Sequence, residues 1–443
     1  MTRRLTIQEA FWGNLLLRNI CPPLDTPLPT ATPLTIIIVL DHASVTGGQA
    51  KVAFDSARGL KRAGHNPIVF AACGPIDADL EREEIEIVCL GQTDILNNPS
   101  RLDAAINGLW NRDAARALGH LLARVPRGNS IVHVHGWAKA LSPSIAGAIK
   151  ASGLPAAYTM HEYFLFCPNG GFFNYQASAA CALEPMSAKC LATHCDSRSY
   201  PQKLWRSARH AAMRHVARMP EAFDDFIAIS NYQRGIVEHR LPRRAALHSI
   251  SNPIDAEDLG PKTDPCSGDI IFVGRIAGEK GPLLFAEAAR AAGVIPVFVG
   301  DGPLRGQLAA AYPEARILGW KSAGEVRTLM RGARALVFPS LWHEGQPLTV
   351  MEAKALGTPV IVSDGCAGRE EIADGISGLW FPSGDVAALT RALTRIRDDG
   401  LAQALSLGAY QSFWSNPPTL DSHVEALQRL YREMLSRRDV RAA

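Results

Sequence analysis

The stretch IIFVGRIAGEKGPLLFAEAARAAGVIPVFVG, residues 270–300, indicates the fold class. It opens and closes with short apolar runs rich in Val and Ile, which are typical of strands buried on both faces of a parallel sheet. A helix-like segment, Pro282–Ala292, joins the two runs, so the stretch predicts a strand–helix–strand unit. The same alternation continues with strands expected at 315–319, 335–339 and 359–363 and helices at 322–332 and 347–356.

A second unit of this kind opens the N-terminal half. The run LTIIIVL at Leu34–Leu40 precedes a glycine-containing turn, a helix over Gln49–Ala63 and a strand at Pro67–Ala72. Further strands are expected at 85–90, 130–134 and 155–159, and proline-rich turns at 250–265 indicate the link between the halves. We therefore predict two Rossmann-like doubly wound α/β domains facing a central cleft, where the carboxyl ends of the strands bind ligands.

Composition narrows the class of protein. The 443 residues include 46 basic and 43 acidic side chains, a near balance that argues against a nucleic-acid partner. No apolar run approaches the ~20 residues that span a bilayer, and residues 1–30 lack the apolar core of a signal peptide. We expect a cytoplasmic protein without structural disulfides.

The segment HEGQPLTVMEAKALGTPVI, residues 343–361, indicates an anion site. Pro347 suits the first residue of a helix, and the free N–H groups near Leu348 would favour a diphosphate. Glu344 then lies just before the helix and Glu352 one to two turns inside it. Both carboxylates could therefore contact the sugar and ribose hydroxyls of one nucleotide-sugar donor. For Glu352 a salt bridge on the helix surface is the alternative.

Two cations follow the first strand of the same domain. Arg275 comes directly after IIFVG and Lys280 five residues later. Such a pair neutralises the charge that builds on a nucleoside diphosphate as its bond to a sugar breaks. Solvated side chains are the alternative for either residue taken alone.

The N-terminal domain offers fewer signals. Gly47 and Gly48 precede a predicted helix, so Gly48 can approach a phosphate without steric conflict, although for the pair taken alone a tight turn is favoured. His161 follows the strand at 155–159 and is placed at the cleft. A structural histidine is the alternative.

Together these motifs, in this order, resemble the retaining glycosyltransferases of family four, which have the GT-B fold. The resemblance covers roughly residues 34–400 and includes GDGP at 300–303. It implies that Arg275 and Lys280 bind the donor diphosphate, that Glu344 and His161 contact the donor sugar, and that Glu352 holds the ribose. The backbone N–H groups of Gly48, Gln346 and Leu348 would complete the phosphate site. Pro347 lies between the last two but has no N–H group to contribute.

The resemblance also implies a reaction. A sugar would pass from a nucleotide-diphosphate donor to a hydroxyl of a glycan or lipid-linked acceptor, as in polysaccharide biosynthesis, by metal-independent front-face substitution. No cofactor would be required beyond the nucleotide sugar. Two alternatives stay open: a nucleotide-sugar epimerase of GT-B fold, and a catalytically inactive sugar-nucleotide-binding scaffold.

Expected domain limits follow. Residues 1–30 are an N-terminal extension, and residues 31–225 are the acceptor domain with a cysteine-containing insertion at 162–200. Residues 226–408 form the donor domain. Residues 409–443 are expected to form helices that pack back on the N-terminal domain, as in relatives.

Cys167, Cys181, Cys190 and Cys195 lie in this insertion, where a structural zinc site and ordinary buried thiols are both open. The basic stretch Lys203–Arg218 is either a helix on an anionic membrane surface, which would make the protein peripheral at the inner face, or an exposed helix.

Two further patterns could signal a metal. His133 and His135 alternate on a strand, and Asp77 and Asp79 form an Asp-x-Asp pair. Neither has suitable partners nearby in sequence, so a structural role for the histidines and a solvated loop for the aspartates are favoured.

Overall fold

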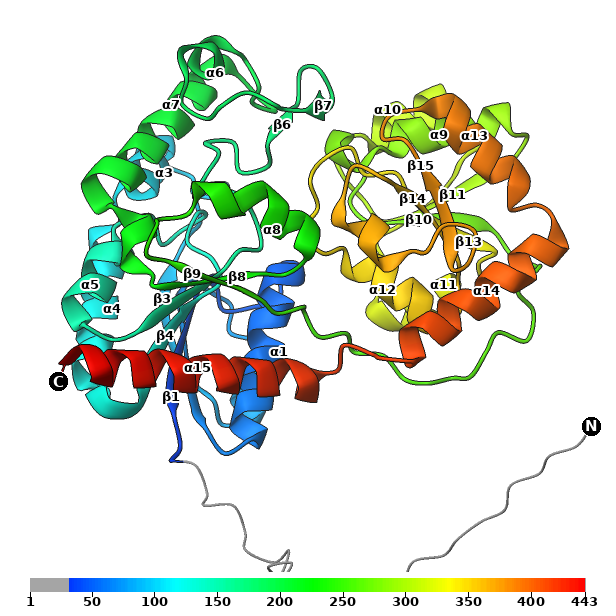
Figure 1. Ribbon diagram of the computed structural model, residues 1–443. Coiled ribbons are helices and arrows are strands. Elements are labelled where there is room, and N and C mark those ends of the chain that lie inside the picture. Colours follow the sequence, from blue (N-terminus) through cyan, green and yellow to red (C-terminus); the bar gives the residue numbers. More distant parts are fainter. Residues whose placement is uncertain (1–31, 443) are drawn as a thin grey trace, which may run out of the picture.

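The computed structural model describes residues 32–442, which form two α/β domains side by side (Figure 1). The expected extension at 1–30 lies outside these residues. The N-terminal sheet has seven parallel strands in the order β3-β2-β1-β4-β5-β8-β9. Their bounds are β1 Thr35–His42, β2 Asn66–Cys73, β3 Glu86–Gln92, β4 Ser130–Val134, β5 Ala156–Thr159, β8 Asp225–Ala228 and β9 Ala246–Ser249.

Helices cover both faces of this sheet. One face packs against α4 and α5, and the other against α1 and the C-terminal helix α15. The helices of this half are α1 Gly48–Arg62, α2 Ala78–Arg82, α3 Arg101–Leu109, α4 Arg112–Arg124, α5 Ile145–Ser152, α6 Ala188–Ala192, α7 Tyr200–Ala211 and α8 Asn231–Val237.

The C-terminal sheet has six parallel strands in the order β12-β11-β10-β13-β14-β15. The strands are β10 Ile270–Val273, β11 Pro296–Val299, β12 Arg316–Gly319, β13 Ala335–Phe338, β14 Val360–Ser363 and β15 Gly378–Phe381. The helices are α9 Pro282–Ala291, α10 Arg305–Ala311, α11 Ala323–Gly332, α12 Leu348–Ala355, α13 Val386–Arg395 and α14 Asp399–Trp414. The expected pair of Rossmann-like domains is confirmed.

The boundary expected between residues 225 and 226 is wrong. Strands β8 and β9 follow residue 224 and pair with the N-terminal sheet, β8 directly against β5. The chain therefore leaves the first domain only after Ser249. The short apolar segment DFIA at Asp225–Ala228 becomes a buried strand because it completes that sheet, which is a long-range requirement.

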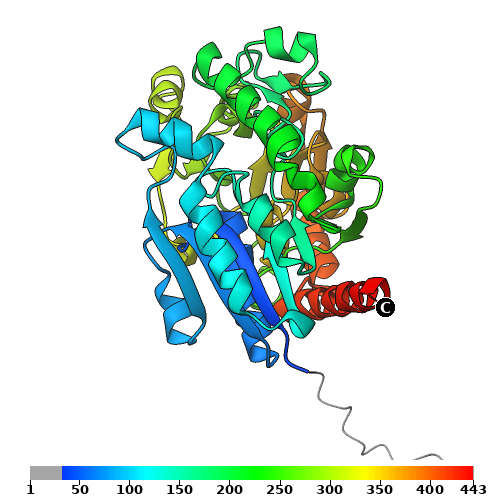
Figure 2. The same ribbon diagram turned by 90° about the vertical axis from the view of Figure 1, so that its left-hand side faces the viewer.

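The C-terminal helix α15, Leu420–Ala442, returns across the N-terminal domain (Figures 1 and 2). Its apolar residues Val424, Leu427 and Tyr431 join the core formed by β1 and α1. The helices approach closely at Gly59 of α1, where a Cβ atom would lie 2.5 Å from the side chain of Val424. A glycine in mid-helix is thus required for this contact.

The segment that joins β5 to β8 carries a small two-stranded sheet, β6 Phe173–Asn174 with β7 Ala179–Ala180. It lies at the same end of the first domain as α6 and α7 (Figure 1). Within residues 32–442, no helix is both long and apolar enough to cross a membrane.

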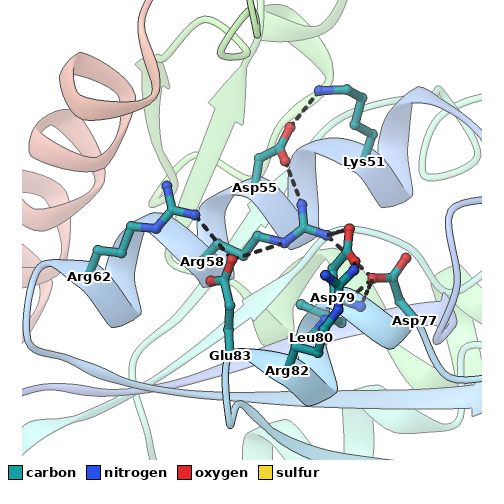
Figure 3. Close-up of polar contacts among 9 residues, drawn as sticks. All are labelled: Lys51, Asp55, Arg58, Arg62, Asp77, Asp79, Leu80, Arg82 and Glu83. Carbon is teal, nitrogen blue, oxygen red and sulfur yellow. Dashed lines mark hydrogen bonds and ion pairs between the residues drawn. The ribbon is translucent and has the colours of Figure 1, made fainter. Parts of the chain in front are cut away.

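Asp77 and Asp79 take structural roles (Figure 3). Asp77 caps α2 by accepting hydrogen bonds from the backbone N–H groups of Asp79 and Leu80 at 3.1 and 3.4 Å. Both carboxylates also form ion pairs with Arg58 of α1, at 3.3 and 3.8 Å. The two aspartates therefore link α2 to α1. The segment expected to be a solvated loop is in fact the capped start of a helix.

Candidate functional site

A cavity of about 910 Å³ lies between the two domains. Eight of the residues singled out from the sequence line it: Gly47, Gly48, His161, Arg275, Lys280, Glu344, Gln346 and Leu348. Pro347 and Glu352 do not line it. The fold thus brings most of the predicted site together from four segments spread over residues 47–348.

The cations of the donor side are held by carboxylates. Lys280 pairs with Glu344, and Arg275 pairs with Glu279, which is buried. Glu344 also accepts a hydrogen bond of 3.0 Å from the Ser340 hydroxyl. Both cations therefore lie in the segment that follows β10, and the ion pair of Lys280 joins it to Glu344 in the segment that follows β13.

The start of α12 faces the glycine turn of the other domain. A Cβ atom on Gly48 would lie 3.5 Å from Cδ1 of Leu348, so the two loops meet across the cavity. Pro347 has extended backbone angles and is the N-cap of α12, one residue earlier than its expected place as the first helical residue. The side chain of Gln346 accepts a hydrogen bond of 2.7 Å from the N–H of Asn252, which ties this loop to the interdomain link.

Glu352 lies deeper, within α12 and outside the cavity lining. Burial raises the pKa of its carboxyl, and the nearby positive charges of Lys51 and Arg327 partly offset this effect. The structure does not bring Glu352 to the same wall as Glu344.

His161 lies against two buried histidines, His133 and His135. Its Nε2 lies 3.0 Å from Nδ1 of His135, and the two rings stack at 5.2 Å. His133 uses both nitrogens, at 2.7 Å each, on the hydroxyls of Thr159 and Tyr431. His133 therefore has no lone pair left for a metal, which agrees with the structural role favoured for this residue.

Family comparisons agree with this geometry. Residues 46–258 match the model described as Glycosyltransferase Family 4, and residues 267–399 match the model described as Glycosyl transferases group 1. The chain belongs to glycosyltransferase family 4. The resemblance stated from the sequence motifs is thereby confirmed.

The chain is similar to several named glycosyltransferases. The chain is 30% identical over 214 residues to UDP-Gal:alpha-D-GlcNAc-diphosphoundecaprenol alpha-1,3-galactosyltransferase of Escherichia coli, covering 42% of this chain and 54% of that protein. It is 26% identical over 318 residues to 2-deoxystreptamine N-acetyl-D-glucosaminyltransferase of Streptomyces fradiae, covering 66% and 69% of the two chains. The chain thus spans about half the length of the galactosyltransferase.

Solved structures show the same fold. A glycosyltransferase from Rickettsia africae aligns with a TM-score of 0.63 at 17% identity, covering 91% of this chain and 99% of that one. Anabaena HepE in complex with UDP and glucose aligns with a TM-score of 0.62 at 14% identity, covering 90% and 100%. These likenesses support the GT-B arrangement of the two family domains.

Several cavity residues were not singled out from the sequence, among them Asp41, Glu162 and Arg209. Asp41 is near the carboxyl end of β1 and Glu162 follows β5, so their positions after parallel strands could have identified them. Burial raises the pKa of Glu162 to about 7. Arg209 lies on α7, and no local pattern indicates that it points inward.

The structure does not gather the four cysteines of the insertion into a metal-binding group within residues 32–442. Cys167, Cys181, Cys190 and Cys195 are free thiols, and residues 32–442 contain no group of three or more His, Cys, Asp or Glu side chains placed to hold a metal ion. Instead, the buried ammonium of Lys203 lies 3.3 Å from Sγ of Cys195 and 3.5 Å from Sγ of Cys190. A cation thus lies beside the sulfurs and would repel a metal ion.

The basic stretch at 203–218 also differs from expectation. Lys203, Arg209 and His210 are buried on the domain side of α7. Three of the seven Lys, Arg and His side chains in this stretch are therefore unavailable to a membrane surface. Packing of α7 against α3 decides this orientation: Nε1 of Trp205 donates a hydrogen bond of 3.3 Å to the carbonyl of Ala105.

The buried histidines make stability depend on pH. Burial lowers the pKa of both His133 and His161 to about 3. Below about pH 6.5 these two imidazoles therefore bind protons in the unfolded chain but stay neutral in the folded chain. The contribution of the neutral histidines to the free energy of unfolding is fully present above about pH 6.5 and is lost as the pH falls toward 3. We expect the melting temperature to fall steadily between pH 6.5 and 4.5.

Glu162 acts in the opposite direction. Its raised pKa gives a contribution that is present below about pH 4.3 and is lost as the pH rises through 7. The variant Glu162→Gln removes this contribution and keeps the shape of the side chain, so melting should fall more steeply on acidification than in wild type. An unchanged melting temperature of the variant over this range would contradict neutral, buried histidines.

Proposed function

We propose that this family member transfers a sugar, with retention, from a nucleoside-diphosphate donor to a hydroxyl of a glycan or lipid-linked acceptor. The observation that supports it is the meeting of Arg275, Lys280 and Glu344 with His161 across one cavity. The E. coli relative is named for transfer from UDP-galactose to a diphosphoundecaprenol-linked sugar, and the HepE structure holds UDP and glucose. A nucleotide sugar is accordingly the donor class.

In this proposal the donor diphosphate exchanges partners with the resident ion pairs. Its oxygens would bind Arg275 and Lys280, which now pair with Glu279 and Glu344. Lys280 is then free to neutralise the leaving phosphate, and Glu344 is free to accept hydrogen bonds from sugar hydroxyls. These side chains supply the positive charge, so the proposed transfer needs no metal ion and no cofactor besides the donor.

His161 would meet the donor sugar as a neutral imidazole. Burial keeps its pKa near 3, and Nε2 is already bonded to His135. Nδ1 makes no hydrogen bond with residues 32–442 and is the nitrogen that remains for a sugar hydroxyl. His135 thus acts as a positioning residue for His161.

The cavity carboxylates favour direct front-face substitution over a covalent intermediate. Asp41 accepts hydrogen bonds from the N–H groups of Lys139, Ala140 and Leu141 at 2.8–3.0 Å. Glu162 accepts one from the Tyr158 hydroxyl and one from the N–H of Phe164, at 2.8 and 2.7 Å. Carboxylates engaged in this way are poor nucleophiles. The leaving phosphate would instead take the proton of the acceptor hydroxyl.

A thermal-shift screen with UDP, GDP, ADP and their sugars tests the donor site. We expect one base to raise the melting temperature, because a ligand that binds only the folded state stabilises it. The rise should be lost in Arg275→Ala and kept in Glu325→Gln, which changes a surface carboxylate on α11. No rise with any nucleotide would overturn the proposed function.

The role of Glu352 is tested in a separate experiment, because this residue lies outside the cavity lining. If it holds the ribose, Glu352→Gln should weaken stabilisation by the nucleotide and leave stabilisation by inorganic pyrophosphate unchanged. Equal loss with both probes would assign Glu352 to the stability of α12 instead. Conversion of the donor without an acceptor would favour an epimerase, and binding without turnover would favour an inactive scaffold.

A further inference from the structure

The N-terminal wall of the cavity carries unpaired positive charge. Seven cavity residues are Arg or Lys, and three of them have carboxylate partners: Arg206, Arg275 and Lys280. The other four form no ion pair with any residue in 32–442, and all belong to the N-terminal domain: Arg101, Lys139, Arg198 and Arg209. In the proposed function the donor diphosphate binds Arg275 and Lys280 on the opposite wall of the cavity. The four unpaired cations are therefore available to bind a different anion.

Arg209 is the fixed member of this group. Its side chain is buried, with 3% of the residue exposed, and its guanidinium carbon lies 5.1, 5.2 and 5.7 Å from the ring centres of Trp205, Phe164 and Trp137. NH1 donates one hydrogen bond of 2.6 Å to the carbonyl of Ala138. The remaining N–H groups have no hydrogen-bond partner among the described residues, although the group lines the cavity.

The nearest acidic groups do not use up this charge. Asp41 and Glu162 influence Arg209 electrostatically, but neither forms an ion pair with it. The Asp41 carboxylate is occupied by three backbone N–H groups, and Glu162 by a phenol and one N–H. Burial lowers the pKa of Arg209 to about 10, so it remains charged at neutral pH. A buried guanidinium with free donors matches the geometry of a phosphate.

Apolar surface continues from the same mouth of the cavity. Ile95, Leu96, Ala104, Pro201 and Trp205 line it on the side of α3 and α7. Beyond the mouth, large apolar side chains are exposed in pairs one helical turn apart on these two helices: Leu102 with Ile106, and Tyr200 with Leu204. A neutral, fully hydrated glycan would not be stabilised by contact with these exposed apolar side chains.

We propose that the cluster of Arg209, Arg101, Lys139 and Arg198 binds the phosphate or diphosphate of a lipid-linked acceptor whose apolar chain lies along α3 and α7. The inference rests on the proposed function and names the acceptor class for the same cavity. Arg209 forms the floor of this subsite, and the three exposed cations form its rim. Charge complementarity and the adjoining apolar edge select an amphiphilic phosphate over a neutral sugar.

The test is binding of farnesyl diphosphate to the full chain, with the donor site saturated by the nucleoside diphosphate found in the thermal-shift screen. Binding is followed by calorimetry for wild type, for the triple variant Arg101→Ala, Lys139→Ala and Arg198→Ala, and for Arg209→Gln. Arg116→Ala, a surface arginine of α4 that pairs with Asp113 outside the cavity, is the matched control. Farnesol and inorganic pyrophosphate are run as probes that lack the phosphate or the chain.

We expect the triple variant to weaken farnesyl diphosphate binding about tenfold or more, because charge-assisted contacts with phosphate are lost. The control should bind as wild type, and added salt should weaken wild type more than the triple variant. Farnesol should not bind, and pyrophosphate should bind more weakly than farnesyl diphosphate. Circular dichroism melting shows whether each variant is folded, and the triple variant covers the case in which Arg209→Gln does not fold.

Three results would overturn the inference: equal binding by wild type and the triple variant, binding of farnesol as tight as that of its diphosphate, or pyrophosphate binding as tight as that of farnesyl diphosphate. Association of wild type with anionic vesicles but not with free farnesyl diphosphate would assign the surface to a membrane instead. Failure here with nucleotide binding intact would leave the proposed function standing. Failure of nucleotide binding would instead overturn the proposed function, and with it the assignment of this subsite to an acceptor.

Discussion

Replacing Lys280 by alanine is expected to lower the turnover number about 10²–10³-fold, the usual cost of removing one fixed group that stabilises developing charge. Lys280 lines the donor side of the cavity and pairs with Glu344. In the proposed transfer its ammonium meets the leaving phosphate, whose charge grows only as the bond to the sugar breaks. The loss should therefore appear mainly in kcat and only weakly in KM.

The measurement is the rate of nucleoside diphosphate release from the sugar nucleotide chosen by the thermal-shift screen. Lys280→Arg keeps the charge and should recover part of the rate. Lys321→Ala, which removes a surface lysine paired with Glu325, is the control for loss of a lysine elsewhere in the same domain. A Lys280→Ala enzyme within threefold of wild type would contradict the role assigned to this cation.

Leu427→Ala is expected to destabilise the N-terminal domain by about 2–5 kcal/mol, the range for truncating a buried leucine. Leu427 lies on α15, 1% exposed, in the core that β1 and α1 also form. Although α15 follows the C-terminal domain in sequence, its loss of packing should weaken the other domain. The cavity left between α15 and the sheet cannot collapse easily, because α1 and α15 are already in close contact at Gly59.

Urea denaturation followed by circular dichroism and tryptophan fluorescence measures this change. Leu407→Ala provides the matched control, because Leu407 is on α14 and 44% exposed. Its effect should stay within about 0.5 kcal/mol, as for most surface substitutions. If Leu427→Ala changed stability no more than the control, α15 would not be part of the N-terminal core.

Local sequence patterns determined the fold class and most of the donor side. The β-branched runs at 34–40 and 270–274 predict buried parallel strands, and carboxyl ends of parallel strands meet at one edge of a sheet. Arg275 directly follows such a strand and Glu344 precedes a helix start, so their place in the cavity followed from chain order alone. Spacing along the chain carries this information because strand and helix geometry are local.

The tertiary structure alone decided the rest. Strand β8 is assigned to the N-terminal sheet only by its pairing with β5, and β9 only by its pairing with β8. Helix α15 is assigned to a domain only by what it covers. The direction of a helical side chain depends on which face packs inward. For that reason the basic residues of α7 divide: Lys203 lies beside the cysteines and Arg209 faces the cavity, which sequence spacing could not distinguish.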